Sequence, residues 1–290
     1  MEHLDSSGAR HTRHAAPEQK HDYGRAGRNI PVSIAVGLSL LAVVLLPLFY
    51  LKDFWWVVPA AAACLGAWEM ARAVRSSGAK APIVPVLGGA ISIISLAWYS
   101  GVDGLSIGLL IAVLATLVWR MGEGPVGYQR DMGAAALILV YVPFLLGFAA
   151  LLAKPDDGAW RILVTLLAVV LSDTGGYVAG VLFGKHPMAP SISPKKSWEG
   201  FAGSILATAV GSAILAALML DLAPWKGAIF GVVVSVAAVL GDLAESLIKR
   251  DLGVKDMSSL LPGHGGLMDR LDSILFAVPT AYLLLSVLAA

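Results

Sequence analysis

The chain has 290 residues, of which 57% are hydrophobic and only 14% are charged, and its formal net charge is +1. Soluble domains carry about 25% charged residues, so a chain depleted of charge over its whole length is adapted to lipid. The near-zero net charge offers no basic field for nucleic acid. The single cysteine, Cys64, excludes an intrachain disulfide, and no cysteine–histidine cluster suggests zinc.

The first 29 residues differ from the rest of the chain. They hold five basic residues and four of the six histidines, with few apolar side chains. Because such a segment cannot bury a core, we predict that 1–29 is a disordered basic cytoplasmic tail. The alternative is a secretory signal peptide, but the apolar run that follows exceeds the roughly 7–15 residues of a signal peptide's hydrophobic region.

The remaining sequence contains nine long apolar runs. A helix crosses the bilayer core with roughly 20 mostly apolar residues, so the sequence predicts an all-α polytopic membrane protein with about nine transmembrane helices. We divide it into N-terminal transmembrane helices over 30–159 and a C-terminal transmembrane part over 160–290, which holds most of the polar motifs described below. The predicted spans are 30–51, 54–74, 83–102, 104–121, 132–153, 160–184, 201–221, 225–249 and 270–290.

Basic residues gather on one side of this predicted arrangement. The tail and the loops after the second, fourth, sixth and eighth spans hold 17 lysines and arginines, and the opposite loops hold four. Since basic loops favour the cytoplasmic side, we predict that the N-terminus lies inside and the C-terminus outside. The chain is then an integral protein of the cytoplasmic (plasma) membrane, with its long polar loops facing the cytoplasm.

Charged residues within the early spans are few. Glu69 and Arg72 lie three residues apart near the end of the second span. Side chains at this spacing are neighbours on a helix, so we interpret them as a local ion pair rather than as part of a site.

The sixth span contains a carboxylate, Asp173, beside the glycines of a Ser-Asp-Thr-Gly-Gly sequence. A charge inside a span costs about 2.5–3.5 kcal/mol. Asp173 is therefore expected to face a cavity or an ion, or else to pair with a basic residue of another helix.

The loop after the sixth span carries Lys195 and Lys196 between serines, just before the next predicted helix. Two lysines and hydroxyl groups at a helix N-terminus form a suitable cradle for an anion. The alternative is a loop whose lysines only set the membrane topology.

The end of the eighth span has a polar face. Asp242, Glu245, Ser246 and Lys249 follow one another at i, i+3, i+4 and i+7, so they lie on one side of a helix. The residues between them are apolar. Such a helix can line a polar cavity while its other face packs against neighbouring helices.

A glycine-rich loop joins the eighth and ninth spans. Pro262 and the glycines around His264 prevent regular helix and allow backbone N–H groups to approach a ligand. We expect His264 to donate or accept a hydrogen bond rather than to bind a metal. Asp269 and Asp272 follow on the first turn of the ninth span, where they share a face.

The carboxylates of Asp242, Asp269 and Asp272 are expected to come together. Clustered carboxylates repel one another without a cation, and their hard oxygen atoms suit Mg²⁺ rather than zinc. Positive side chains for phosphate groups surround them in the sequence, at Lys249, Arg250, Lys255 and Arg270.

These residues form one long pattern that resembles the signature of the phosphatidate cytidylyltransferase (CDP-diacylglycerol synthase) family. The segments 172–177 and 193–200 also resemble patterns of that family. The resemblance is specific over about 172–276 and only topological over 30–171. The pattern itself is Ser246-x-x-Lys249-Arg250-x4-Lys255-Asp256-x5-Pro262-Gly263-His264-Gly265-Gly266-x2-Asp269-Arg270-x-Asp272.

The resemblance implies an enzyme that transfers a cytidylyl group from CTP to phosphatidate, giving CDP-diacylglycerol and pyrophosphate for phospholipid biosynthesis. It implies Mg²⁺ held by Asp242 and Asp269, and a second, monovalent cation. Lys249 and Asp272 join these two aspartates as expected catalytic residues. The expected substrate-binding residues are Asp173, Lys195, Lys196, Ser246, Arg250, Lys255, His264 and Arg270.

Other functions fit parts of the sequence. A transporter or channel would use Asp173, Asp242 and Glu245 as an ion path, but the charges gather at one side and no inverted repeat is visible. A related CTP-dependent membrane enzyme could act on another lipid, such as an isoprenoid alcohol or an archaeal ether lipid. An inactive scaffold is a third alternative. The alanine- and glycine-rich spans permit a homodimer without requiring one.

Overall fold

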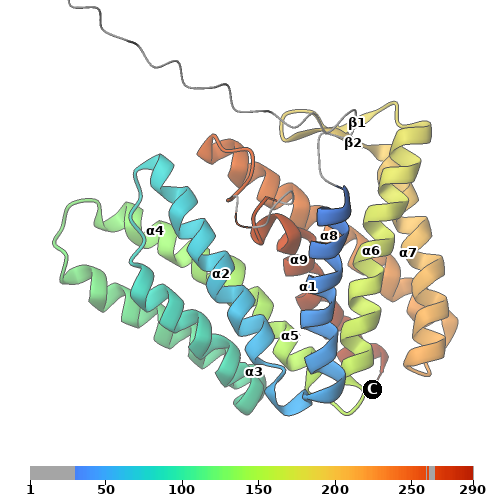
Figure 1. Ribbon diagram of the computed structural model, residues 1–290, viewed down its shortest axis with the longest axis horizontal. Helices are drawn as coiled ribbons and strands as arrows, with labels where there is room; N and C mark the ends of the chain where they lie inside the picture. Colours follow the sequence, from blue (N-terminus) through green and yellow to red (C-terminus); the bar gives the residue numbers. More distant parts are fainter. Residues whose placement is uncertain (1–29, 259, 261–264, 290) are drawn as a thin grey trace, which may run out of the picture.

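The computed structural model describes residues 30–258, 260 and 265–289, so the tail 1–29 and His264 lie outside the described residues. Helices run between two ends of the molecule, with a small hairpin at one end and the C-terminus at the other (Figure 1). The helices are α1 (Ile30–Tyr50), α2 (Val57–Ala73), α3 (Ile83–Met121), α4 (Tyr128–Leu139), α5 (Leu145–Ala153), α6 (Gly158–Phe183), α7 (Trp198–Met219), α8 (Pro224–Leu252) and α9 (Met268–Leu288).

Short elements connect these helices. Two 3-10 turns flank α2, at Lys52–Phe54 and Val74–Ser77, and a π-helical turn at Val140–Phe144 joins α4 to α5. The strands β1 (Pro187–Ala189) and β2 (Ser193–Ser197) pair antiparallel and form a hairpin that the sequence did not predict.

Most of these helices, taken with the short turns that extend α2 and join α4 to α5, are candidates to span a membrane. In the described part of the chain, seven helices are long and apolar enough to cross a membrane, and a shorter apolar helix covers Gly37–Tyr50. The prediction of an all-α membrane protein is therefore confirmed, with the β1–β2 hairpin as its one addition among the described residues.

Helix α3 folds back on itself. Its 39 residues would extend about 58 Å as a straight helix, roughly twice the thickness of a bilayer core. Gly101 has φ 69° and ψ −148°, which breaks the helix. A Cβ atom on Gly108 would lie 2.7 Å from the Ile93 Cα, although residues 15 apart in a straight helix are about 22 Å apart. The segments 83–100 and 102–121 therefore pack antiparallel.

Gly104 makes this close return possible, and an alanine there tests it. A Cβ atom on Gly104 would lie 2.0 Å from the Leu96 carbonyl oxygen, a backbone atom that cannot move aside. We expect Gly104→Ala to destabilise the protein by about 1–3 kcal/mol. The measurement is thermal unfolding in detergent. Gly88→Ala is the matched control, because a Cβ there meets nothing within 4 Å. Equal unfolding midpoints for the two variants would contradict the prediction.

The second half of the chain packs through small residues. Helices α6 and α7 lie side by side (Figure 1). A Cβ atom on Gly175 would come within 2.7 Å of the Gly203 carbonyl oxygen, and one on Gly203 within 2.2 Å of the Ala179 Cβ. Glycine at these positions lets the helices approach closely, which is how helices associate in lipid.

Hydroxyl groups join α6, α7 and α8 inside this packing. The Ser172 and Ser235 hydroxyl oxygens are 2.9 Å apart, and the Ser204 hydroxyl donates to the Ser172 carbonyl oxygen at 2.7 Å. All three serines are buried. Because Asp173 follows Ser172, this network fixes the part of α6 that carries the carboxylate.

Contacts between loops assign them to the two ends of the molecule. At one end, the Lys52 ammonium donates to the Pro155 carbonyl oxygen at 2.7 Å, and the Lys226 ammonium donates to the Leu288 carbonyl oxygen at 2.7 Å. At the hairpin end, the Lys80 N–H donates to Asp131, the Ser76 hydroxyl to the Leu252 carbonyl oxygen, and the Arg250 Nε to the Ile192 carbonyl oxygen.

Candidate active site

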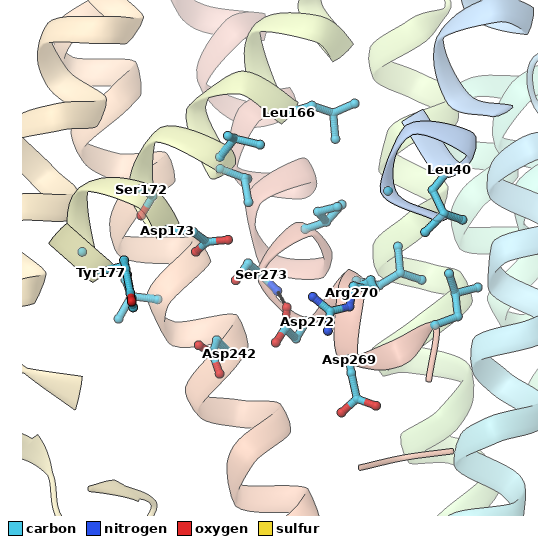
Figure 2. A pocket seen from close by; sticks show the side chains of 18 of the residues that line it. Leu40, Leu166, Ser172, Asp173, Tyr177, Asp242, Asp269, Arg270, Asp272 and Ser273 are labelled. Atoms are coloured by element: carbon cyan, nitrogen blue, oxygen red, sulfur yellow. Dashed lines mark hydrogen bonds between the residues drawn. The ribbon is translucent and has the colours of Figure 1, made fainter. Parts of the chain in front are cut away.

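A cavity of about 1000 Å³ lies among α1, α2, α6, α7, α8, α9 and the hairpin. Figure 2 shows aliphatic side chains such as Leu40 and Leu166 in one part of it and the carboxylates of Asp242 and Asp269 in another. The cavity therefore joins an apolar part to a charged part. Seven predicted site residues line it, namely Asp173, Lys195, Lys196, Asp242, Asp269, Arg270 and Asp272.

The hairpin carries its two lysines into the cavity because its base is held on α7. The Glu199 carboxylate accepts hydrogen bonds from the N–H groups of Lys185 and His186, at 3.1 and 3.2 Å. The Ser197 hydroxyl caps α7 by accepting from the Gly200 N–H at 3.1 Å. Each of these hydrogen bonds gives a partner to a backbone N–H group, either before the hairpin or in the first turn of α7.

Asp242 on α8 holds the hairpin from the opposite side. Its carboxylate forms an ion pair with the Lys196 ammonium at 2.7 Å and accepts a hydrogen bond from the Ser246 hydroxyl at 3.3 Å. Lys196 also donates to the Val239 carbonyl oxygen at 3.4 Å. The charges of Lys196 and Asp242, which both line the cavity, thus neutralise each other.

Asp269 closes the loop that precedes α9. Its Oδ2 accepts from the backbone N–H groups of Met257 and Gly266, at 3.1 and 2.8 Å. Its Oδ1 accepts from the Lys249 ammonium at 2.8 Å. One carboxylate therefore joins the two sides of the loop to each other and to α8.

Lys249 lies behind Asp269. Its ammonium bridges Asp269 and the Glu245 carboxylate, at 2.8 and 3.0 Å, and Glu245 is fully buried. Two carboxylates balance this one ammonium, and Lys249 does not line the cavity. The structure thus places Lys249 as a support for Asp269, whereas Lys196 takes the position facing the cavity.

Asp173, Asp242 and Asp272 come from three different helices and face a common space (Figure 2). Helix α9 approaches α8 closely because of Gly241, where a Cβ atom would lie 2.4 Å from the Asp272 carbonyl oxygen. The Asp272 carboxylate accepts from the Ser273 N–H at 2.6 Å. The small residue before Asp242 therefore brings the two carboxylate-bearing faces together.

Comparison with known proteins agrees with this geometry. Residues 32–288 match the Cytidylyltransferase family. The chain belongs to this family. The phosphatidate cytidylyltransferase of Mycobacterium bovis is 39% identical over 289 residues, which cover 95% of this chain and 94% of the relative. The phosphatidate cytidylyltransferase of Mycobacterium leprae is 41% identical over 280 residues, covering 91% and 90%. These matches confirm the resemblance drawn from the motifs and extend it over the N-terminal helices.

The carboxylates of this cytidylyltransferase family member supply oxygen donors of the kind that Mg²⁺ prefers. Among the described residues, no three Asp, Glu, His or Cys side chains are grouped to hold a metal by themselves. The expected cluster of Asp242, Asp269 and Asp272 is therefore not a complete metal site by itself. All three carboxylates line the cavity, and the Asp269 carboxylate also accepts hydrogen bonds from Lys249 and from the loop. Mg²⁺ at nucleotide sites uses one or two carboxylates and completes its shell with phosphate oxygens and water. Two carboxylates would therefore be enough as the protein's ligands to such an ion.

The predicted residues Arg250 and Lys255 do not line the cavity. Arg250 is exposed, and its Nε donates to the Ile192 carbonyl oxygen at 3.3 Å, which ties α8 to the hairpin. Lys255 is exposed in the loop after α8, and Arg270 is exposed at the cavity. The prediction for His264 falls outside the described residues.

The sequence-based interpretation of Glu69 was also wrong. The predicted ion pair with Arg72 is wrong, because the Arg72 guanidinium lies 4.8 Å from the centre of the Trp68 ring. The Glu69 carboxylate instead accepts hydrogen bonds from Leu267 and Met268 at the start of α9. A carboxylate within an apolar helix was the signal that singled out Asp173, and the same signal was present at Glu69.

Proposed function

We propose that the protein transfers the cytidylyl group of CTP to phosphatidate, forming CDP-diacylglycerol and releasing pyrophosphate. The observation that carries this proposal is one cavity in which lysines and carboxylates adjoin an apolar part lined by α1, α2 and α6. A nucleotide and a lipid can meet only where a polar and an apolar solvent are both accessible. Two relatives with this printed name cover nearly the whole chain.

The reaction requires positioning more than proton transfer. A phosphate oxygen of phosphatidate is already ionised at neutral pH, so it attacks the α-phosphorus of CTP without a general base. The bond from that phosphorus to the bridging oxygen breaks, and pyrophosphate leaves with the electron pair. Orientation of the two substrates and neutralisation of their charges then lower the barrier.

The charged side chains divide these tasks. Lys195, Lys196 and Arg270 line the cavity and supply positive charge for phosphate groups. Asp242 and Asp269 would hold Mg²⁺, with Asp272 beside them, and the ion would stabilise charge on the leaving pyrophosphate. Ser246 orients Asp242, and Lys249 orients Asp269, through the contacts described above.

The apolar part of the cavity receives the acyl chains. Leucine and valine side chains of α1 and α2 line it, as do Leu166, Val169 and Val170 of α6. A phosphatidate that entered between these helices would keep its chains in lipid while its phosphate reached the lysines. The substrate would thus come from the membrane leaflet nearest to the hairpin.

We propose nine crossings, with the N-terminus in the cytoplasm and the active site facing the cytoplasm of a plasma membrane. Two observations support this topology: α3 contains two antiparallel segments, and the loops joined by contacts at the hairpin end are the ones rich in lysine and arginine. Basic loops favour the cytoplasmic side, where CTP is present. Figure 1 shows α1 beginning at the hairpin end and the C-terminus at the opposite end, which an odd number of crossings requires.

Product formation by the purified protein tests the proposal. In detergent with labelled CTP, phosphatidate and Mg²⁺, we expect a labelled CDP-lipid. Asp242→Ala should lower the rate by about 10³-fold. Asp103→Ala is the control, because Asp103 is an exposed carboxylate beside the Gly101 turn. No product from the wild type, or full activity of Asp242→Ala, would refute the proposal. An isoprenoid alcohol or an ether-lipid phosphate offered in parallel tests the related enzymes.

A further inference from the structure

A carboxylate from the N-terminal half of the chain reaches the loop that precedes α9. Glu69 lies on α2, and its side chain has no exposed surface. Its partners are 189 to 199 residues away in the sequence. Burying a carboxylate costs free energy unless several hydrogen-bond donors surround it. The donors that contact Glu69 therefore indicate which part of the fold it stabilises.

Glu69 binds both ends of the glycine-rich turn. Its Oε1 accepts from the Ser258 hydroxyl at 2.5 Å and from the Leu267 N–H at 2.9 Å. Its Oε2 accepts from the Met268 N–H at 2.8 Å. Ser258 precedes the turn, and Leu267 and Met268 follow it. The carboxylate therefore fixes the distance between the two ends of the turn.

The start of α9 favours an anion at this place. The first N–H groups of a helix have no partner within the helix, and the helix dipole adds partial positive charge there. Glu69 satisfies two such N–H groups with two different oxygens. A glutamine cannot do the same, because its amide nitrogen would point one N–H donor at another.

A glycine makes room for this contact. A Cβ atom on Gly266 would lie 2.8 Å from the Glu69 Oε2 and 2.9 Å from its Oε1. Gly266 also donates its N–H to Asp269 at 2.8 Å. The backbone at Gly266 is thus held between two carboxylates, Glu69 on one side and Asp269 on the other.

We propose that Glu69 is a positioning residue for the transfer reaction. By capping α9 and tying its start to Ser258, Glu69 sets the directions in which Asp269 and Asp272 leave the first turn of the helix. This inference rests on the proposed function for its effect on catalysis. Its structural part, the clamping of the turn, can be tested without any substrate.

Glu69→Gln in the full-length protein in detergent is the first test. We expect kcat to fall by about 10²-fold, the cost of a misplacement of roughly 1 Å, and the Mg²⁺ concentration for half-maximal activity to rise. Amide exchange in a peptide covering 265–272 should become faster in the absence of substrate. Glu69→Asp, which keeps the charge, should recover part of the activity.

Asp131→Asn is the matched control. Asp131 is also a buried carboxylate on a spanning helix that accepts a loop N–H, from Lys80 at 2.8 Å, and it pairs with Arg120 at 2.9 Å. Its loss should destabilise the protein without changing kcat per folded enzyme or the Mg²⁺ requirement. Faster exchange is expected around 78–82, the loop whose Lys80 N–H donates to Asp131, and not in 265–272.

Gly266→Ala covers the case in which Glu69→Gln does not fold. The added methyl group pushes the turn away from Glu69 while both carboxylates remain, and we expect the same loss of kcat and the same faster exchange. Wild-type kcat, Mg²⁺ dependence and exchange in the variants that fold would overturn the inference. An inactive wild type would instead refute the proposed function, and the exchange data would still decide whether Glu69 clamps the turn.

Discussion

Asp269→Asn is expected to lower kcat/KM by about 10³-fold or more, because one carboxylate performs three tasks. The Asp269 carboxylate accepts a hydrogen bond from the Lys249 ammonium. It also accepts hydrogen bonds from the N–H groups of Met257 and Gly266, on the two sides of the loop. It is also a proposed Mg²⁺ ligand. Asparagine keeps the size of the side chain but replaces one acceptor oxygen by an N–H donor, so that one of these contacts becomes repulsive.

Steady-state kinetics with varied CTP and Mg²⁺ measure this loss. Asp251→Asn is the control, since Asp251 is an exposed carboxylate at the end of α8. We expect the control to retain wild-type kcat/KM. A tenth or more of the wild-type kcat/KM in Asp269→Asn would show that this carboxylate is dispensable and would remove the main ligand from the proposed site.

Lys249→Met is expected to have the largest effect on stability. The change leaves Glu245, which is fully buried, and Asp269 without their cation. Removing one partner of a buried ion pair costs about 3–5 kcal/mol. We expect thermal unfolding in detergent to shift accordingly. Lys255→Met, at an exposed position of the following loop, should change stability by about 0.5 kcal/mol or less.

A double variant separates stability from activity at this position. Glu245→Gln in the Lys249→Met background removes one uncompensated buried charge, so part of the lost stability should return. Activity should not return, because Asp269 still lacks the donor that orients it. Recovery of both properties together would show that Lys249 contributes only to folding.

Helical spacing contributed to predicting which side chains line the cavity. Asp242 on α8 and Asp272 on α9 line one cavity with Asp173, as their positions on polar faces indicated. Lys195 and Lys196 reach the same cavity from the loop after α6. Helical period grouped Asp242 with Asp272, the predicted topology placed the two lysines beside them, and the family resemblance added Asp173.

Which lysine faces the cavity could not be predicted from helical spacing. Lys196 and Lys249 both belong to motifs that resemble the family. Lys196 faces the cavity, whereas Lys249 is enclosed by Glu245 and Asp269. The difference depends on the rotation of α8 against α9 and on a hairpin that the sequence did not predict. Local spacing also favoured Arg72 as the partner of Glu69, whereas the actual donors lie beyond residue 257.

Helix boundaries shifted by a few residues where polar groups extend a helix past the apolar run. Helix α8 continues to Leu252 rather than to 249, because Lys249 and Arg250 remain helical until Gly253 adopts a left-handed conformation with φ 68°. Helix α7 begins at Trp198 rather than at 201, immediately after the Ser197 cap. These helix ends depend on capping residues, which a hydropathy pattern does not detect.

The turn at Gly101 decides on which side of the proposed topology the later helices begin and end. Without it, α3 would deliver the chain to the far end of the molecule, and the loops that meet through Lys80 and Asp131 would lie at opposite ends. Every later element would then be inverted, including the hairpin and the loop held by Glu69 and Asp269. In the proposed nine-crossing topology, the turn at Gly101 therefore sets the parity of the chain, and with it which aqueous compartment would supply CTP and take up pyrophosphate.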